Sequence, residues 1–228
     1  MMINSNRSLV ERPLVAGKRR NDSGTSGSTT IFFRPKGRLI CVLTLCLGLA
    51  FVANGLYIPA KATVAQWLLD RAWNRSVEHD MDVSRPWPWA DTSPIARIKT
   101  EIGGRVIDQL ILSGASDRNL AFGPAHVLPS ARPGRSGHVV ISGHRDTHLN
   151  WLAQLSMGTQ ITLEGRHSNQ VYEVVLIEVI DLVEQQFHLS SDEDLLTLVT
   201  CYPLDGLLPG TTERYLVHAR LVDEHRSS

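Results

Sequence analysis

Three residues in the second half of the chain have side chains that together could perform covalent chemistry on a peptide bond. His144 and Cys201 each follow a short apolar run, and Arg214 begins a segment that alternates in polarity. A thiolate is a nucleophile, an imidazole exchanges protons near neutral pH, and a guanidinium keeps its charge and can stabilise an oxyanion. Each residue type is ordinary by itself, so the hypothesis depends on the combination.

Cysteine usage singles out Cys201. The chain has three cysteines, and Cys41 and Cys46 fall in a long apolar stretch, where they are most simply small apolar residues. A cysteine alone in an exported domain has no internal disulfide partner, so it is a free thiol or half of an intermolecular bridge. A buried structural thiol is the alternative interpretation, because free cysteines are often buried.

The elements that must position these residues are short β-rich runs from residue 95 onward. Gly, Pro, Asn, Asp and Ser separate the runs, and strands do not alternate regularly with long helices as they would in a parallel α/β sheet. We therefore predict an all-β domain, a closed or nearly closed barrel with His144 and Cys201 at strand ends. The expected strands are 95–99, 105–112, 138–142, 160–163, 171–180, 195–201 and 214–222, with a short helix at 150–155.

A membrane anchor is predicted before this domain. Residues 39–58 contain no charged side chain, and a transmembrane helix needs about 20 apolar residues. A cleaved signal peptide and a buried core helix are the alternatives. A signal peptide would have a shorter apolar region, and a buried helix seldom runs so long without a polar face. The chain is neutral overall, but residues 1–38 carry eight basic and two acidic side chains. This excess predicts a cytoplasmic N-terminus and places the residues after the span outside the cytoplasm.

The chain therefore divides into four predicted segments. Residues 1–38 are a basic cytoplasmic tail, expected to be disordered because small polar residues leave it little apolar area to bury. Residues 39–58 form the transmembrane helix, and residues 59–85 form a linker helix. The catalytic domain is expected at residues 86–228, a length that suits one hydrophobic core.

Three short motifs resemble the catalytic segments of a known family. G-H-R-D-T at 143–147, T-L-V-T-C at 197–201 and E-R-Y-L-V at 213–217 are similar to the three catalytic segments of sortases, in the usual order His, Cys, Arg. The resemblance covers about residues 86–222.

The likeness is closer to the sortases of Gram-negative bacteria, often called class GN or marine sortases. PWPWADTSPIARI at 86–98, LAFGPAHV at 120–127, SGHRDTHL at 142–149 and TLVTCYP at 197–203 are similar to that subgroup's sequence blocks. Where the subgroup commonly has phenylalanine after the CYP element, this chain has Leu204.

The resemblance implies an eight-stranded sortase β-barrel that acts as a transpeptidase. The Cys201 thiolate would attack the carbonyl after the threonine of an LPXTG-like sorting signal and form a thioester. His144 would protonate the leaving amine and later deprotonate an amine acceptor, while Arg214 would stabilise the oxyanion or position the peptide. The expected partners are a protein with a C-terminal sorting signal, an amine acceptor and membrane lipid. The resemblance also implies a single-pass protein of the inner membrane with a periplasmic catalytic domain.

Three neighbours of these residues are further candidates for substrate binding. Asp146 and His148 lie close to His144 in sequence and could orient it, and Thr200 directly precedes the thiol. Each has an ordinary alternative as a solvated loop residue or a β-branched strand residue. The remaining histidines lack the spacing of metal ligands, so we expect no metal and no cofactor. No nucleic-acid partner is expected.

Two other interpretations remain open from the sequence. One is a different enzyme with the same nucleophile, a periplasmic Cys-His peptidase or an L,D-transpeptidase acting on cell-wall peptides. Papain-like enzymes place their cysteine at a helix start, whereas Cys201 follows a strand pattern, which disfavours that fold. The other is a membrane-anchored β-barrel that only binds a partner, in which case the Cys-His-Arg set would be a coincidence.

Overall fold

A computed structural model describes residues 35–81, 84–184, 193–206 and 211–226 of the chain. The predicted cytoplasmic tail lies outside the described residues up to position 34. The chain divides into two compact units, residues 1–50 and residues 51–228.

A single long helix, α1 (Pro35–Glu78), contains the predicted span. It includes an apolar window with a mean hydropathy of 2.3, and none of the side chains in that window is buried. Exposed apolar area of this extent is typical of a surface that lipid covers. The helix is long and apolar enough to cross a membrane, and it continues without a break through most of the predicted linker.

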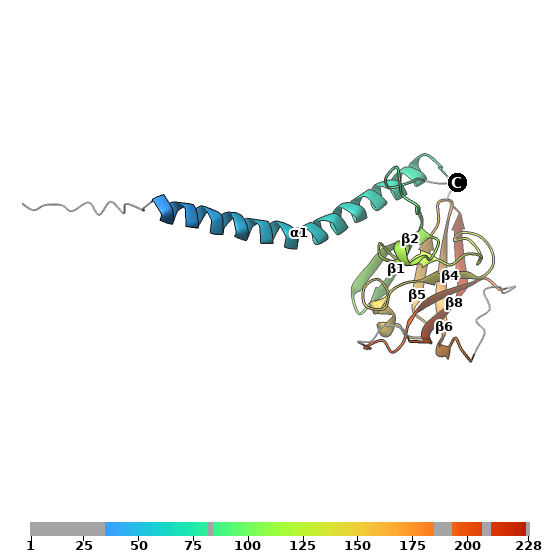
Figure 1. Ribbon diagram of the computed structural model, residues 1–228. Coiled ribbons are helices and arrows are strands. Elements are labelled where there is room, and N and C mark those ends of the chain that lie inside the picture. The colour runs from blue at the N-terminus through green and yellow to red at the C-terminus, as the bar shows by residue number, and fades with distance from the viewer. Residues whose placement is uncertain (1–34, 82–83, 185–192, 207–210, 227–228) are drawn as a thin grey trace, which may run out of the picture. The chain divides into compact units, whose positions relative to one another are not determined.

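The second unit contains a closed barrel of eight strands, as predicted (Figure 1). Its hydrogen-bonded order is β1-β2-β3-β4-β7-β8-β6-β5, and two neighbouring pairs, β2–β3 and β4–β7, are parallel. The strands are β1 (Pro94–Ile102), β2 (Arg105–Ser113), β3 (Ala125–His126), β4 (Val139–Ser142), β5 (Gln160–Glu164), β6 (Ser168–Asp181), β7 (Leu195–Cys201) and β8 (Glu213–Arg226).

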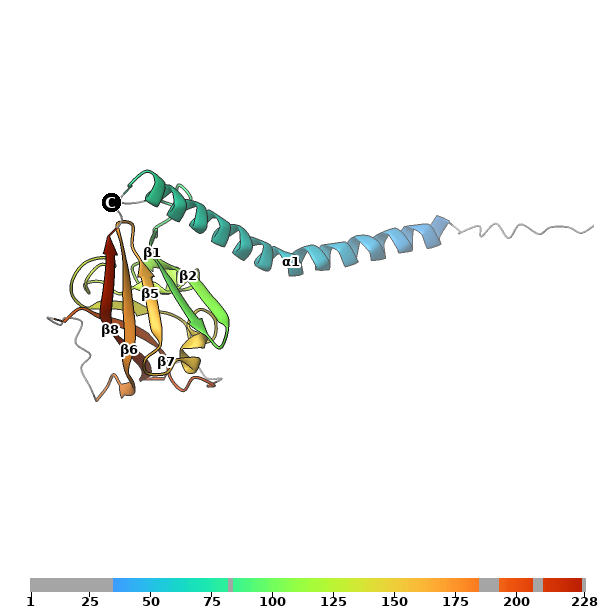
Figure 2. The ribbon, with the colours of Figure 1, turned by 180° about the vertical axis from the view of Figure 1, so that it is seen from behind.

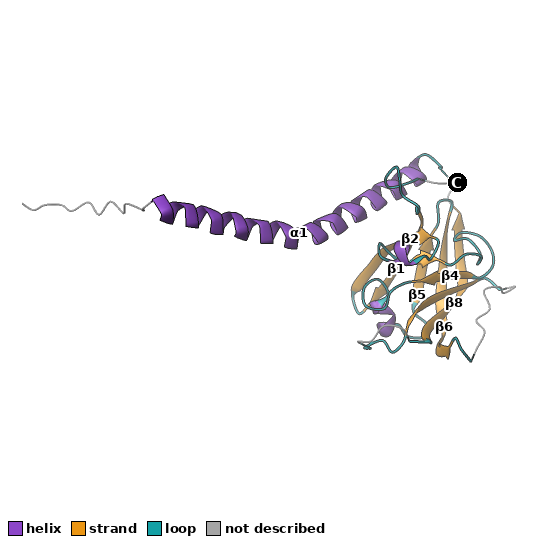
Figure 3. Cartoon of the chain, viewed as in Figure 1, coloured by secondary structure: helices purple, strands orange, loops and turns teal. Residues whose placement is uncertain are grey.

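Short helices lie in the connections of the barrel (Figure 3). One is α2 (Asp117–Leu120), and the other is a 3₁₀ helix, η1 (Asn150–Gln154), where a short helix was expected. Every predicted strand overlaps an observed one. Strand β3 was missed because a pair of residues is too short to show an alternating pattern.

Residues at alternate positions along the strands point into the barrel and form its hydrophobic core. In β1, Ala96 and Ile98 are buried in the core while Arg97 and Lys99 point outward, as the period of two requires. The same core holds Trp151, which follows β4 in sequence. Each fully buried aliphatic side chain contributes about 1.5–3 kcal/mol through removal of apolar surface from water.

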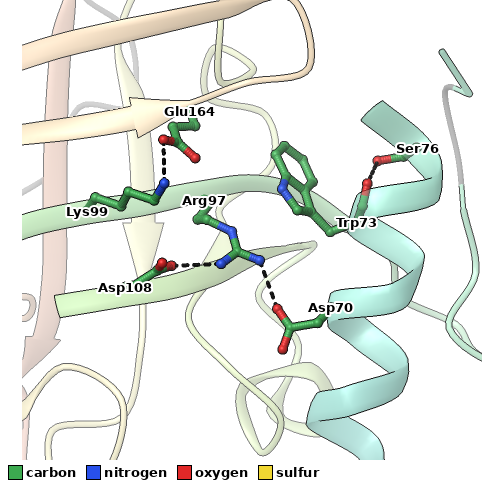
Figure 4. Close-up of polar contacts among 7 residues, drawn as sticks. All are labelled: Asp70, Trp73, Ser76, Arg97, Lys99, Asp108 and Glu164. Carbon is green, nitrogen blue, oxygen red and sulfur yellow. Dashed lines mark hydrogen bonds and ion pairs between the residues drawn. The ribbon is translucent and has the colours of Figure 1, made fainter. Parts of the chain in front are cut away.

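The C-terminal turns of α1 pack on the outside of the barrel, within the second unit. Leu69 and Trp73 belong to a small buried cluster with side chains of β2 and β3. Nearby, Arg97 forms ion pairs with Asp70 of the helix at 2.8 Å and with Asp108 of β2 at 3.0 Å (Figure 4). This half-buried guanidinium therefore links the helix to two strands.

The strand directions define two ends of the barrel. At the end that we call the Cys201 end, β4 and β7 finish and β8 begins. At the opposite end, called the far end, β4 and β7 begin and β8 finishes; β6 and β8 run side by side between the two ends (Figure 2).

Candidate active site

Cys201 and Arg214 are direct neighbours across two antiparallel strands. They form a register pair of β7 and β8, in which opposite Cβ atoms lie about 4.5–5.5 Å apart. The pairing continues beyond them, because the Tyr202 N–H donates to the Glu213 carbonyl at 3.1 Å. Both side chains are partly exposed. The thiol and the guanidinium are therefore held next to each other on a hydrogen-bonded part of the sheet.

The parallel strand β4 brings His144 to the same end of the barrel. Ser142 pairs with Val199 of β7, and the Gly143 N–H donates to the Val199 carbonyl at 3.1 Å. His144 is the next residue, its side chain is exposed, and its carbonyl accepts from the Leu149 N–H at 3.0 Å. Three segments distant in sequence thus deliver the imidazole, the thiol and the guanidinium to the Cys201 end.

Gly143 is required where the His144 segment leaves the sheet. A Cβ at this position would lie 2.7 Å from the Leu149 side chain, closer than real Cβ atoms approach. Leu149 is buried in the barrel core and cannot easily move aside. A side chain at position 143 would therefore displace the turn that carries His144.

Thr200 lies on the opposite face of β7 from Cys201. It is buried, and its hydroxyl donates to the Gly143 carbonyl at 2.8 Å. The bond ties the end of β4 to the end of β7, so Thr200 sets the spacing between the segments that carry His144 and Cys201. Direct contact of Thr200 with a substrate stays a prediction.

The Arg214 guanidinium is anchored by its own turn. Its Nη1 donates to the carbonyls of Thr211 at 2.6 Å and Glu213 at 2.8 Å. A guanidinium has five N–H donors, so Nε and Nη2 keep donors that no other described residue accepts. Those donors are suited to a developing oxyanion beside the thiol.

Arg145 is a site residue that the sequence analysis missed. It is only 6% exposed, its Nη1 donates to the Pro203 carbonyl at 2.7 Å, and its Nε donates to an Asp146 oxygen at 2.8 Å. The hydrogen bond that Arg145 donates to Asp146 is the main cause that raises the pKa of Arg145, and the charge of Cys201 adds to it. Arg145 therefore joins the His144 segment to the turn after Cys201.

The turn after Cys201 is shaped to admit this guanidinium. A Cβ on Gly206 would lie 2.8 Å from Arg145 Nη1 and 3.1 Å from the Pro203 carbonyl oxygen. The signal for Arg145 in the sequence was the adjacent Arg-Asp pair after His144. Sequence alone could not show that the arginine turns inward to bond a segment that is remote along the chain.

Asp146 and His148, the two candidate orienting residues, have different surroundings. The hydrogen bond with Arg145 is the main cause that lowers the pKa of Asp146, and the charge of His144 lowers it further. The pKa of His148 is lowered, mainly by burial. The charge of His144 also lowers it, and the hydrogen bond with the Ala121 backbone opposes both effects. The structure thus places Asp146 and His148 within electrostatic reach of His144. Their contact with substrate stays a prediction.

Comparison with known proteins identifies the class to which this barrel and its site belong. The family model described as "Sortase domain" matches residues 100–222, which is more than half of the chain. The chain therefore belongs to the sortase family, whose members are cysteine transpeptidases. The narrower likeness to class GN stays a prediction.

Individual relatives agree with this family. The chain is 29% identical to Sortase D of Bacillus subtilis (strain 168) over 113 residues, which are 49% of this chain and 57% of that protein. The match thus spans little more than half of the relative's length. Two solved structures show the same fold: a Sortase D5 transpeptidase of Clostridium perfringens and Sortase C-3 of Streptococcus pneumoniae.

The first of these structures has a TM-score of 0.55 and 22% identity, and the match covers 71% of this chain and 99% of that one. The second has a TM-score of 0.52 and 21% identity, with 72% of this chain and 85% of that one covered. At these identities the likeness establishes the barrel fold and no more.

Proposed function

We propose that this chain is a membrane-anchored transpeptidase that cleaves an LPXTG-like sorting signal and transfers the acyl part to an amine. One observation carries the proposal: Cys201 and Arg214 form a cross-strand pair, and the strand on the other side of β7 delivers His144 to the same end. The narrower class GN assignment suggests a Gram-negative source. On that basis α1 anchors the chain in the inner membrane, with its N-terminus cytoplasmic and the barrel periplasmic.

The first half of the reaction forms the thioester. The Cys201 thiolate adds to the carbonyl carbon after the threonine, and the carbonyl electrons move onto oxygen, where the free N–H donors of Arg214 stabilise the charge. The tetrahedral intermediate then expels the amine of the next residue, which takes a proton from the His144 imidazolium. The segment beyond the cleaved bond leaves, and the substrate stays bonded to sulfur.

The second half resolves the thioester. An incoming amine loses a proton to the now neutral His144 imidazole and attacks the same carbonyl carbon. The second tetrahedral intermediate collapses with the Cys201 thiolate as leaving group, so a new amide bond replaces the thioester. The proton held by His144 at the end is the one needed for the next turnover, and the cycle balances.

The surrounding hydrogen bonds preorganise both steps. Thr200 ties the His144 segment to β7, and Arg145 ties it to the turn after Cys201. Neither residue reacts in this scheme, so both are positioning residues. Their bonds exist without substrate, which lowers the ordering cost in the transition state.

A peptide assay of the full chain in detergent tests the proposal. The substrate is a fluorogenic LPXTG peptide, offered with and without a glycine-peptide amine, and Cys201→Ala is compared with the unaltered chain. We expect cleavage that depends on Cys201, a ligated product with the amine, and an acyl adduct on Cys201 in mass spectra.

Other outcomes would support the alternatives. Cleavage by Cys201 that never yields a ligated product would favour a Cys-His peptidase. Cleavage only of cell-wall peptides would favour an L,D-transpeptidase. Peptide binding without turnover would favour an anchored binding module, and each of these results would overturn the proposed reaction.

A further inference from the structure

The far end of the barrel contains a large cavity, remote from Cys201. Its volume is about 1090 Å³, and it lies between the connection from β3 to β4 and the turn from β5 to β6. Asp194, which directly precedes β7, lines this cavity, and β7 ends at Cys201. At about 3.3 Å per residue, the two sites lie about 20 Å apart along the strand. The cavity therefore is not part of the site described above.

The walls of this cavity are predominantly basic. Arg132 and Arg135 line it from one side, and Arg166 and His167 line it from the other. Its one lining carboxylate, Asp194, already accepts hydrogen bonds from Ser136 Oγ and the Gly137 N–H. Asp80 lies 3.6 Å from Arg166 Nη1 and 3.1 Å from His167 Nε2, so the excess of positive charge comes from Arg132 and Arg135.

Arg132 and Arg135 are held close together by a tight turn. The Arg135 N–H donates to the Arg132 carbonyl at 3.0 Å, which places the two Cα atoms within about 7 Å of each other. Both side chains are exposed, and neither forms an ion pair with any residue that the structure describes. Two cations carried by one tight turn without a carboxylate partner repel each other, and a bound anion would reduce this repulsion.

The turn is locked against the opposite wall of the cavity. Gly134 has a φ of +80°, and a Cβ there would lie 2.8 Å from Ser168 Oγ. The Gly134 N–H donates to Gln170 Oε1 at 3.0 Å. Because only glycine fits this approach, the backbone of the turn that carries the two arginines has a defined position beside the cavity.

A largely buried amide adds a neutral donor to the cavity wall. Gln170 is 1% exposed and lines the cavity, and its Oε1 accepts from the Gly134 N–H and from Tyr172 OH at 3.1 Å. These two donors fix the orientation of the amide. Its Nε2 then has donors that nothing in the described part of the chain accepts. This nitrogen is not one of the fully buried atoms that lack a partner, so it opens onto the cavity, where an anionic oxygen would accept its hydrogen bond.

From these observations we infer that the far-end cavity binds a phosphate ester. Guanidinium groups match phosphate oxygens with paired N–H donors, and the Gln170 amide adds a neutral donor. The cavity is larger than a phosphate ion, so the ligand carries its phosphate on a larger body. A phospholipid headgroup and a soluble phosphorylated metabolite share this chemistry. The inference does not depend on the proposed transpeptidation.

Calorimetric titration of the full chain with glycerol 3-phosphate tests the inference. The chain is held in nanodiscs of phosphatidylcholine alone, and the variants are the double change Arg132→Gln with Arg135→Gln, and Gln170→Glu. Gln170→Glu keeps the oxygen that Gly134 and Tyr172 use but replaces the donor with an acceptor. The matched control is Arg105→Gln, which changes an exposed arginine at the start of β2. Only the other end of this strand, at Ser113, reaches the cavity.

We expect saturable binding that weakens at least about tenfold in both variants and is unchanged in the control. Thermal unfolding and peptide cleavage verify that each variant is folded. Repeating the titration in an equal mixture of phosphatidylcholine and phosphatidylglycerol separates the sources. Competition by the anionic lipid identifies a headgroup, and unchanged binding identifies a soluble ligand. The inference is overturned if no saturable binding occurs, or if the folded variants bind as well as the unaltered chain.

Discussion

Two arginines at the Cys201 end of the barrel differ from two at the far end in whether the chain supplies hydrogen-bond partners for their side chains. At the Cys201 end, Arg145 bonds the Pro203 carbonyl and Asp146, and Arg214 bonds two carbonyls of its own turn. At the far end, Arg132 and Arg135 line a cavity and pair with no carboxylate among the residues described. The chain itself therefore anchors Arg145 and Arg214 at the Cys201 end, and its described residues give Arg132 and Arg135 no carboxylate partner.

This difference is the one expected between a site that is preorganised for catalysis and a site that waits for a ligand. A catalytic end must have its groups in place before the substrate arrives, because ordering them during the reaction would raise the barrier. A binding end gains selectivity from leaving donors without acceptors until the right ligand supplies them. Substitutions at the Cys201 end should therefore lower turnover, whereas equivalent changes at the far end should leave turnover intact.

Replacing His144 should have the largest effect on turnover. His144→Ala removes the only proton carrier in the proposed scheme, so kcat for peptide cleavage should fall about 10²–10⁴-fold. His167→Ala, which changes an exposed histidine at the far end, is the matched control and should keep full activity. Equal losses in the two variants would remove the contrast between the ends. Steady-state cleavage of the fluorogenic peptide measures both.

Replacing Arg214 with lysine should have the next largest effect. A lysine keeps the charge but has a single ammonium, which cannot hold the Thr211 carbonyl and reach an oxyanion at once. We expect kcat/KM to fall about 10²-fold, the usual cost of one oxyanion donor. Arg220→Lys changes an exposed arginine on the same strand and should be silent. Full activity of Arg214→Lys would show that a positive charge at position 214 is enough to stabilise the oxyanion.

Arg145 should have a smaller effect of a different kind. Arg145→Met removes the bond to Pro203 and lets the turn after Cys201 move, so kcat should fall about tenfold with little change in KM. Arg145→Lys should recover part of the loss, because it can remake one of the two bonds. Arg118→Met, which breaks the exposed pair with Asp91, is the control. A change in KM alone would assign Arg145 to substrate binding instead.

Much of the barrel could be predicted from the sequence because its strands alternate. In β7 and β8, apolar residues at every second position mark the core face, and Leu198 and Val217 lie there as expected. The missing strand, β3, and helix α2 fall in a long connection where tertiary contacts rather than local pattern decide the structure. Asn119, for example, is placed by bonds to the carbonyls of Ser113 and Gly114.

The candidate site was only partly predictable for a related reason. Residue type and motif point to Cys201, His144 and Arg214, because their chemistry is visible in the side chains themselves. The role of Arg145 at this site depends on its contact with the remote Pro203 carbonyl. The role of Gln170 in the far-end cavity likewise depends on its contact with the remote Gly134 N–H. No local pattern encodes a contact between segments that only the closed barrel brings together.

The smallest expected effect concerns the pH dependence of stability, and it involves both ends. Burial is the main cause that lowers the pKa of His126 at the far end and of His148 near the Cys201 end from the ordinary value of 6.5. Below about that pH the unfolded chain binds protons that the folded chain does not. The free energy of unfolding should therefore fall between about pH 7 and about pH 5.

Urea unfolding followed by tryptophan fluorescence measures this slope, and His126→Gln tests the contribution of His126. In the folded chain His126 Nε2 donates to the Ala131 carbonyl at 2.9 Å, and glutamine keeps an N–H donor at the ε position but has no proton to gain in this range. The variant should therefore show a shallower fall, with peptide cleavage unaltered because His126 lies at the far end. An unfolding free energy that stays level or rises on acidification would show that neither histidine is held neutral by burial. The two ends would then differ in the partners of their arginines, and neither end would hold a histidine whose pKa is lowered by burial.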